Sequence, residues 1–397
     1  MKKNNKKPKL RFSGYTDDWE QRKFSDLYAP LVERNSDLLP YNKTLSVATM
    51  TYKTDGNGAA DSSLANYKRL RTGDIAFEGH TSKSFRYGRF VLNDVGDGIM
   101  SPRFSALRPL AQMPTNFWKY YIHYEPIMRK ILVASTKAGT MMNELVIDEF
   151  LKSSVLVPSI EEQTRIGSIL KNIDNLITLH QRKLEKLQNM KKSCLQKMFP
   201  KDGATVPEIR FSEFQGDWEE RTLGSCFDER LESLPDGELL SVTIGSGIKK
   251  FSELDRHDNS NTDKSKYKRV CIGDIAYNSM RMWQGASGRS PYEGIVSPAY
   301  TVVKPIGDID TQFFAYMFKK KEIIHLFEIN SQGLTSDTWN LKYPAFSKIV
   351  VRVPRNVEEQ SRIARFLLEL DELISCTEQE IEITKRMKKG CFQKMFV

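Results

Sequence analysis

The chain contains two copies of one long pattern, and this repeat constrains its fold more than any other feature. The first motif reads Pro-x-x-Arg-Phe-Ser and carries a tryptophan seven residues after the phenylalanine. Five motifs return in the same order: residues 8–22 and 207–221, 67–77 and 267–277, 98–102 and 294–298, 161–166 and 358–363, and 191–199 and 388–396. A shared order across so many separate motifs predicts a tandem duplication of one structural unit.

Each copy divides into two parts of different composition. The first part mixes short β-branched and aromatic runs, such as residues 89–93 and 297–304, with Gly, Pro, Asn and Asp. This pattern predicts a globular domain of mixed α and β structure, of the α+β class. We expect a first domain at residues 1–158, a long helix at 159–199, a second domain at 200–354 and a second long helix at 355–397.

The closing part of each copy shows the spacing of a coiled-coil helix. Apolar residues alternate at steps of three and four, in the same register in both copies. The first series is Ile166, Leu170, Ile173, Ile177, His180, Leu184 and Leu187, and the second is Ile363, Leu367, Leu370, Ile374, Thr377, Ile381 and Thr384. A lone amphipathic helix cannot bury such a seam, so we predict that the two helices pair antiparallel and hold the two domains apart. The alternative is that each helix packs only on its own domain.

The balance of charge indicates an anionic partner. A formal net charge of +10 and a pI near 9.1 favour nucleic acid first and a membrane surface second. No apolar run approaches the roughly 20 residues that span a bilayer. The five cysteines are odd in number and lack metal-ligand spacing. We therefore expect an unexported, cytoplasmic protein with reduced thiols.

The sequence lacks the motifs of the common DNA-modifying reactions. It has no Gly-x-Gly-x-x-Gly, no Asn/Asp-Pro-Pro-aromatic tetrapeptide and no Gly-Lys dipeptide. Its single Pro-Asp, at Pro235, is not followed by the acid-x-Lys pattern of Mg²⁺-dependent nucleases, and its five histidines stand singly. We predict no catalytic residue, no cofactor and no metal site in this chain.

Two pairs of loops have compositions that suit DNA contact, and the first pair mixes cations and aromatic side chains with glycines. The better pair follows the repeated Gly-Asp-Ile and contributes Lys83, Arg86, Arg89, Arg281, Gln284 and Arg289. The lower-ranked pair contributes Lys137, Thr140, Gln332 and Thr335. Basic loops are also often merely solvated, so this alternative stays open. The Gly-Asp pairs at Gly73 and Gly273 are expected to close a turn into a buried strand rather than to contact DNA.

The whole chain resembles the specificity subunits of type I restriction-modification systems. The resemblance rests on Pro158 with Glu161-Glu162-Gln163, the same motif at Pro354, the Gln-Lys-Met-Phe ends, the repeated Gly-Asp-Ile and the duplication itself. It implies that each globular half is a target recognition domain reading one half of a split DNA site, while the helices measure the gap. It also implies that two methyltransferase subunits dock on the chain and that motor-nuclease subunits join them.

Two other classes of function remain open at this point. One is a stand-alone sequence-specific DNA-binding regulator, which the duplication and the charge also permit. The other is a coiled-coil adaptor without nucleic acid, for which two domains with basic loops would be superfluous. Salt-dependent binding to duplex DNA distinguishes the adaptor from the other two.

Overall fold

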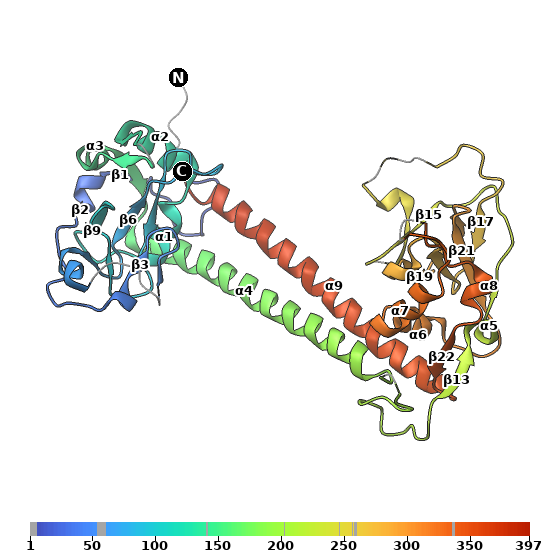
Figure 1. Ribbon diagram of the computed structural model, residues 1–397. Coiled ribbons are helices and arrows are strands. Elements are labelled where there is room, and N and C mark those ends of the chain that lie inside the picture. Colours follow the sequence, from blue (N-terminus) through green and yellow to red (C-terminus); the bar gives the residue numbers. More distant parts are fainter. Residues whose placement is uncertain are drawn as a thin grey trace. The chain divides into compact units, whose positions relative to one another are not determined.

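The computed structural model describes residues 6–53, 61–139, 142–201, 203–245, 247–255, 257, 260–335 and 338–397. Contacts divide the chain into two compact units. The first unit comprises Met1–Gln181 and Gln379–Val397, and the second comprises Arg182–Glu378. Each unit therefore contains one globular domain together with parts of both long helices (Figure 1).

The first globular domain is built on a four-stranded antiparallel sheet of order β2-β9-β6-β7. Two-stranded antiparallel pairs β1-β12, β3-β4, β5-β8 and β10-β11 surround it. The strands are β1 (Glu20–Lys23), β2 (Tyr28–Pro30), β3 (Leu45–Ser46), β4 (Thr51–Tyr52), β5 (Lys68–Leu70), β6 (Ile75–Glu78), β7 (Arg89–Leu92), β8 (Gly98–Met100), β9 (Ala106–Pro109), β10 (Thr136–Lys137), β11 (Glu144–Leu145) and β12 (Ser154–Val157).

The described part of this domain also contains the α-helices α1 (Thr115–Tyr121), α2 (Glu125–Ser135) and α3 (Ile147–Lys152). The aromatic side chains of α1 pack against the sheet in a core that also contains Phe90 of β7 and Phe150 of α3. The rings of Phe90 and Phe150 lie 4.5 Å apart, and Trp118 meets Tyr28 edge to face at 5.7 Å. Aromatic packing of this kind accounts for much of the buried apolar surface of the domain.

The second globular domain repeats the same topology. Its four-stranded sheet has the order β14-β21-β18-β19, and β13-β22, β15-β16 and β17-β20 form pairs beside it. Its elements are β13 (Glu219–Thr222), α5 (Leu223–Cys226), β14 (Phe227–Glu229), β15 (Leu240–Thr243), β16 (Gly247–Lys250), β17 (Lys268–Val270), β18 (Ile275–Asn278), β19 (Ser287–Arg289), β20 (Gly294–Val296), β21 (Tyr300–Pro305), α6 (Thr311–Met317), α7 (Lys321–Ile329), α8 (Tyr343–Phe346) and β22 (Val350–Val353).

Strand pairing confirms the duplication at the level of hydrogen bonds. In the first domain the opening strand β1 pairs with the closing strand β12, with Glu20 opposite Val157. In the second domain β13 pairs with β22, with Glu219 opposite Val353. Each domain therefore closes on itself by joining its first strand to its last, immediately before a long helix begins.

The two long helices are α4 (Ile160–Lys197) and α9 (Val357–Lys394), each of 38 residues. In the first unit, Asp174 of α4 forms an ion pair with Lys388 of α9, with oxygen and nitrogen 2.6 Å apart. In the second unit, Lys191 of α4 pairs with Asp371 of α9. The early part of each helix thus lies beside the late part of the other, which confirms the predicted antiparallel pairing.

The packing of the helix ends excludes the alternative in which each helix contacts only its own domain. Met395 and Phe396 follow α9, yet they lie in the core of the first domain, where Phe396 approaches the rings of Phe117 and Tyr121. Met198 and Phe199 occupy the corresponding place in the core of the second domain. The repeated Gln-Lys-Met-Phe motif is therefore a core anchor at each helix end.

A buried ion pair holds the start of each long helix. Glu162 is 1% exposed and accepts two hydrogen bonds of 2.8 Å from Arg11. Arg11 is the arginine of the repeated Arg-Phe motif. Glu359 accepts the same pair of bonds from Arg210. The second glutamate of each Glu-Glu-Gln motif thus joins the long helix to the segment that opens the same domain.

Candidate nucleic-acid interface

The repeated Gly-Asp-Ile forms a structural turn, as expected. Gly73 and Gly273 adopt left-handed φ values of +96° and +93°, which a residue with a side chain rarely accepts. Asp74 is 1% exposed and accepts hydrogen bonds from the backbone nitrogen of Arg71 and from the guanidinium of Arg108. A carboxylate so placed stabilises the turn and the strand β6 that follows it.

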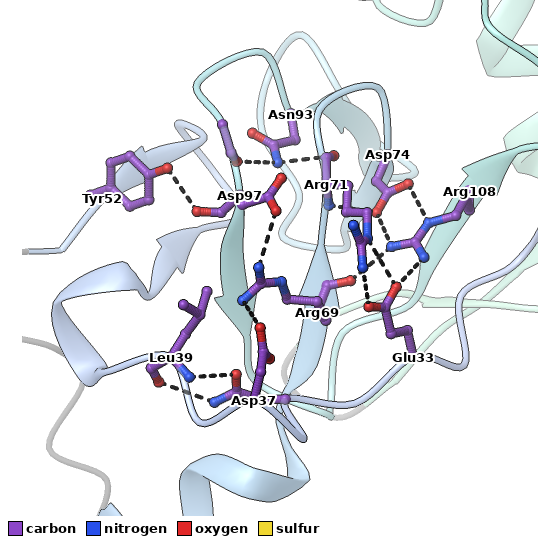
Figure 2. A network of polar contacts seen from close by, with 12 residues as sticks. Glu33, Asp37, Leu39, Tyr52, Arg69, Arg71, Asp74, Asn93, Asp97 and Arg108 are labelled. Carbon is purple, nitrogen blue, oxygen red and sulfur yellow. Dashed lines mark hydrogen bonds and ion pairs between the residues drawn. The ribbon is translucent and has the colours of Figure 1, made fainter.

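Several arginines of the first domain are committed to this internal network. Figure 2 shows Glu33 between Arg71 and Arg108. Arg69 donates a hydrogen bond of 3.0 Å to Asp97. Hydrogen bonds from Arg71 and then Arg108 lower the pKa of Glu33 to about 2. Guanidinium groups paired in this way hold strands and loops together, so they are weaker candidates for DNA contact than unpaired cations are.

In the second domain the equivalent buried carboxylate pairs with an arginine from a different position of the repeat. Asp274 is 2% exposed and accepts hydrogen bonds of 2.6 and 3.1 Å from Arg230, which follows β14. Arg108 in the first domain lies instead on β9. The turn has therefore kept its charge pairing while the source of the cation has changed between the copies.

The first candidate loop of the first domain lies between β6 and β7. Lys83 and Arg86 are exposed on it. Arg89 is half-buried at the start of β7, where its guanidinium lies 5.0 Å from the ring centre of Phe85 and donates to the carbonyl of Ala48 at 2.8 Å. Lys83 and Arg86 are thus available to a ligand, whereas Arg89 braces the loop.

The structure brings the second candidate loop of this domain against the first. Asn143 donates its backbone N–H to the carbonyl of Gly79 at 2.9 Å and its side-chain amide to the carbonyl of Arg86 at 3.2 Å. A Cβ atom at Gly79 would lie only 2.1 Å from the Asn143 carbonyl, so the contact requires glycine there. Lys137 is exposed in β10 on the same connection, and Thr140 lies outside the described residues.

The second domain joins its two candidate loops in a different way. Trp283 of the loop between β18 and β19 meets Trp339 of the later loop edge to face, with ring centres 5.3 Å apart. Leu341 donates its backbone N–H to the carbonyl of Ser279 at 2.9 Å. In this domain an aromatic pair and a backbone hydrogen bond join the two loops, whereas in the first domain hydrogen bonds from Asn143 join them.

The predicted residues of these two loops differ in exposure. Arg281 is exposed at the start of the first loop, and Gln284 is half-buried in its short 3-10 helix. Gln332 and Thr335 are exposed on the second loop, where Gln332 and Asn340 exchange backbone hydrogen bonds of 3.1 and 2.8 Å. Arg289 is separate from these, since it ends β19 and donates to the hydroxyl of Thr311.

Behind the loops, equivalent positions carry different half-buried bases. His123 follows α1, and burial followed by the charge of Arg89 lowers its pKa to about 4. Lys319 follows α6, and burial lowers its pKa to about 8. The ammonium of Lys319 donates to the carbonyls of Ile244, Gly285 and Ser287 at 2.6 to 3.1 Å. Lys319 thereby holds the end of the Arg281 loop.

The sequence did not reveal the residues that unite the loops. The roles of Asn143, Trp283, Trp339 and Lys319 depend on contacts between segments that are distant in the chain. The one available signal was composition, since each loop of the second domain contains a tryptophan among polar residues. Tryptophan is usually well buried, so a tryptophan in a polar loop is a signal that can mark such segments.

The long helices expose a second surface, of apolar character. In the first unit Leu176, Leu179, Ile383 and Met387 are each at least two-fifths exposed, although the seam residues beside them are buried or half-buried. In the second unit Met190 and Leu373 are similarly exposed. Leu176 and Leu373 hold equivalent positions in the repeat, as do Met190 and Met387. Apolar residues kept outside a coiled-coil seam in both copies are typical of a docking face.

No helix among the described residues has the length and apolar character needed to cross a membrane. Within the same residues, His, Cys, Asp and Glu form no group of three or more that suits a metal ion.

Comparison with known proteins gives a consistent result. Residues 81–189 match the model of the type I restriction modification DNA specificity domain. The chain is 22% identical over 412 aligned positions to a type I restriction enzyme MjaX specificity subunit of Methanocaldococcus jannaschii, covering 94% of this chain and 91% of that protein. It is 23% identical over 301 positions to the MjaVIII specificity subunit of the same organism, covering 68% of this chain and 67% of that protein.

A solved structure shares the fold over the full length. The S subunit of a type I restriction-modification system from M. genitalium superposes with a TM-score of 0.59 at 15% sequence identity, covering 98% of this chain and 99% of that one. These matches do not favour a stand-alone regulator. The chain is thus similar along most of its length to specificity subunits of type I restriction-modification systems, and its residues 81–189 match the DNA specificity domain of that family.

Proposed function

We propose that each globular domain reads one half of a split, asymmetric DNA site. The target recognition domains are residues 1–158 and 200–354, and the long helices, residues 159–199 and 355–397, set the gap between the half-sites. One observation carries this proposal: the same two loops meet in both domains, but with different side chains on them. Two equivalent loop pairs of different composition suit two different half-sites.

The loop residues supply the chemistry that base and phosphate contacts need. Lys83, Arg86 and Lys137 in the first domain, and Arg281 in the second, are exposed cations suited to phosphates or to the acceptor edge of guanine. Gln284 and Gln332 offer the paired donor and acceptor that adenine requires. We retain Thr140 and Thr335 as further contacts. Arg89 and Arg289 are better suited to holding the loops, because both already donate within the protein.

We further propose that the chain acts without a catalytic site and recruits its chemistry. In this account two methyltransferase subunits dock on the long helices, and motor-nuclease subunits join them. The exposed apolar residues of the helices support this, since equivalent positions in both copies would each receive one copy of the same partner. The absence from the sequence of methyltransferase, P-loop and nuclease motifs agrees with the proposal.

The test is to map methylated bases across a genome in which this chain is co-expressed with its methyltransferase. We expect a split, asymmetric motif whose methylation disappears when the chain is removed. Arg86→Met with Lys83→Met should weaken or relax one half-site only, and Arg281→Met with Gln332→Met should affect only the other. Changing a specific contact costs about 1–3 kcal/mol at that position.

Matched controls lie on the same domains, away from the loops. Lys130→Met on α2 and Lys348→Met after α8 change exposed lysines and should leave both half-sites methylated as before. Methylation that persists without the chain would refute the proposal. A loop variant that altered both half-sites equally would refute the assignment of one domain to each half.

A further inference from the structure

A carboxylate in the first unit ties three separate elements together. Asp174 of α4 accepts a hydrogen bond of 2.6 Å from the hydroxyl of Tyr120. It also forms an ion pair with Lys388 of α9, with oxygen and nitrogen 2.6 Å apart. Tyr120 belongs to α1 of the globular domain. The ammonium of Lys388 also lies 5.5 Å from the centre of the Tyr120 ring. One carboxylate thus joins the domain to both long helices.

The second unit contains the same arrangement with the helices exchanged. Asp371 of α9 accepts a hydrogen bond of 2.8 Å from the hydroxyl of Tyr316 and forms an ion pair with Lys191 of α4. The ammonium of Lys191 lies 5.7 Å from the Tyr316 ring centre. Tyr120 and Tyr316, and the two aspartates, occupy equivalent places in the repeat. We call these groups of three the clamp triads.

The clamp triads differ from ordinary surface ion pairs in their geometry. Exposed lysine–carboxylate pairs contribute little because they are hydrated and free to rearrange. Here the tyrosine rings are buried, at 8% and 7% exposed, and each fixes the direction of its hydroxyl. Burial, together with the neighbouring aspartate, raises the pKa of both hydroxyl groups, so they stay protonated and donate. A directional bond to an ionised acceptor is roughly twice as strong as a neutral one.

We infer that the clamp triads are positioning residues that fix the angle of each recognition domain on the helix pair, and thereby the number of base pairs accepted between the half-sites. This inference rests on the proposed function. Successive base pairs lie about 3.4 Å apart along the duplex, so a small rocking of a domain on its helices carries its loops from one spacing to the next. The triads oppose that rocking because they join the domain to both helices at once.

The experiment compares spacings rather than overall activity. A plasmid library presents the half-sites of the wild-type enzyme at the natural gap and at gaps one and two base pairs shorter or longer. Each variant chain is co-expressed with its methyltransferase, and methylation is counted at every gap. We expect Tyr120→Phe and Lys388→Met to raise methylation at the neighbouring gaps about tenfold relative to the natural gap, with both half-site sequences unchanged.

Conservative and neighbouring variants separate positioning from general damage. Lys388→Arg keeps the positive charge and should show the same gap preference as the wild-type chain. Lys389→Met removes the adjacent exposed lysine of α9 and should have no effect. Tyr316→Phe repeats the test independently in the second unit, and thermal unfolding confirms that each variant is folded.

The possible results distinguish the role of the clamp triads from the proposed function on which it rests. An unchanged gap preference in Tyr120→Phe, Tyr316→Phe and Lys388→Met would overturn the role of the clamp triads and leave the proposed function standing. A change in the half-site sequences would also overturn it, because the triads would then act through the loops. A wild-type chain with no split motif would overturn the proposed function and this inference together.

Discussion

Two residues at one position of the repeat show how the copies have diverged. His123 and Lys319 both follow the helix that packs beneath the sheet, and both are bases held in surroundings that oppose their charge. Lys319 satisfies its ammonium with three backbone carbonyls. Nε2 of His123 has no hydrogen-bond partner among the described residues. The same position of the repeat therefore holds a charged lysine that stabilises a loop in one domain and a neutral histidine in the other.

The neutral state of His123 predicts an acid-sensitive first domain. Unfolded histidine takes up its proton near pH 6.5, whereas burial and the charges of Arg89, Lys119 and Lys388 delay this to about pH 4 in the folded chain. The unfolded state binds more protons between these values, so stability should fall as the pH is lowered from 6.5 to 4, by about 3 kcal/mol in all. Denaturant unfolding at a series of pH values measures this loss.

His123→Phe should remove that part of the pH dependence, since it replaces the ring with an apolar one of similar size. His325→Gln is the matched control, because His325 is exposed on α7 and its loss should leave the slope unchanged. A wild-type slope in His123→Phe would show that another group is responsible.

At the scale of elements, the long helices could be predicted from the sequence, whereas the contacts that attach them to the globular domains could not. Heptad spacing predicted both helices and the seam, because a helix repeats its face every few residues regardless of what surrounds it. The pairing of Glu162 with Arg11 joins residues 151 positions apart. Periodicity carries no information about such a partner.

This attachment predicts a large difference between two adjacent glutamates. Glu162→Gln leaves the guanidinium of Arg11 without its buried counter-charge, and removing one partner of a buried pair costs about 3–5 kcal/mol. Glu161→Gln changes an exposed neighbour and should cost less than about 0.5 kcal/mol. Chemical unfolding of both variants measures the difference, and equal values would mean that the Arg11 pair adds nothing to stability.

For the whole molecule, the duplication carried most of what the sequence predicted. It correctly indicated two domains of one topology and two equivalent helices, because repeated motifs must fold alike. It did not reveal that the candidate loops meet, since Asn143 reaches Gly79 in one copy and Trp339 reaches Trp283 in the other. Divergent loops lose the repeat signal in the very segments where specificity is proposed to lie.

Lengthening the helices should alter the gap and nothing else. Inserting one heptad near Leu184, with a matched heptad near Ile381, keeps the seam in register and adds about 10 Å of helix. At about 3.4 Å per base pair, the methylated motif should gain roughly three base pairs between unchanged half-sites. Methylation mapping checks this, and altered half-site sequences would mean that the helices do not act as a spacer.

The seating of Met395 and Phe396 in the first domain has a consequence for how the protein is made. Residues 379–397 leave the ribosome after all of residues 182–378, yet they belong to the first unit. The domain that is translated earlier therefore waits, with part of its aromatic core uncovered, while the later one is already complete in sequence. Nascent chains usually fold from the N-terminus onward. Here the order of completion is reversed, because the last residues of the chain complete the core of the first unit.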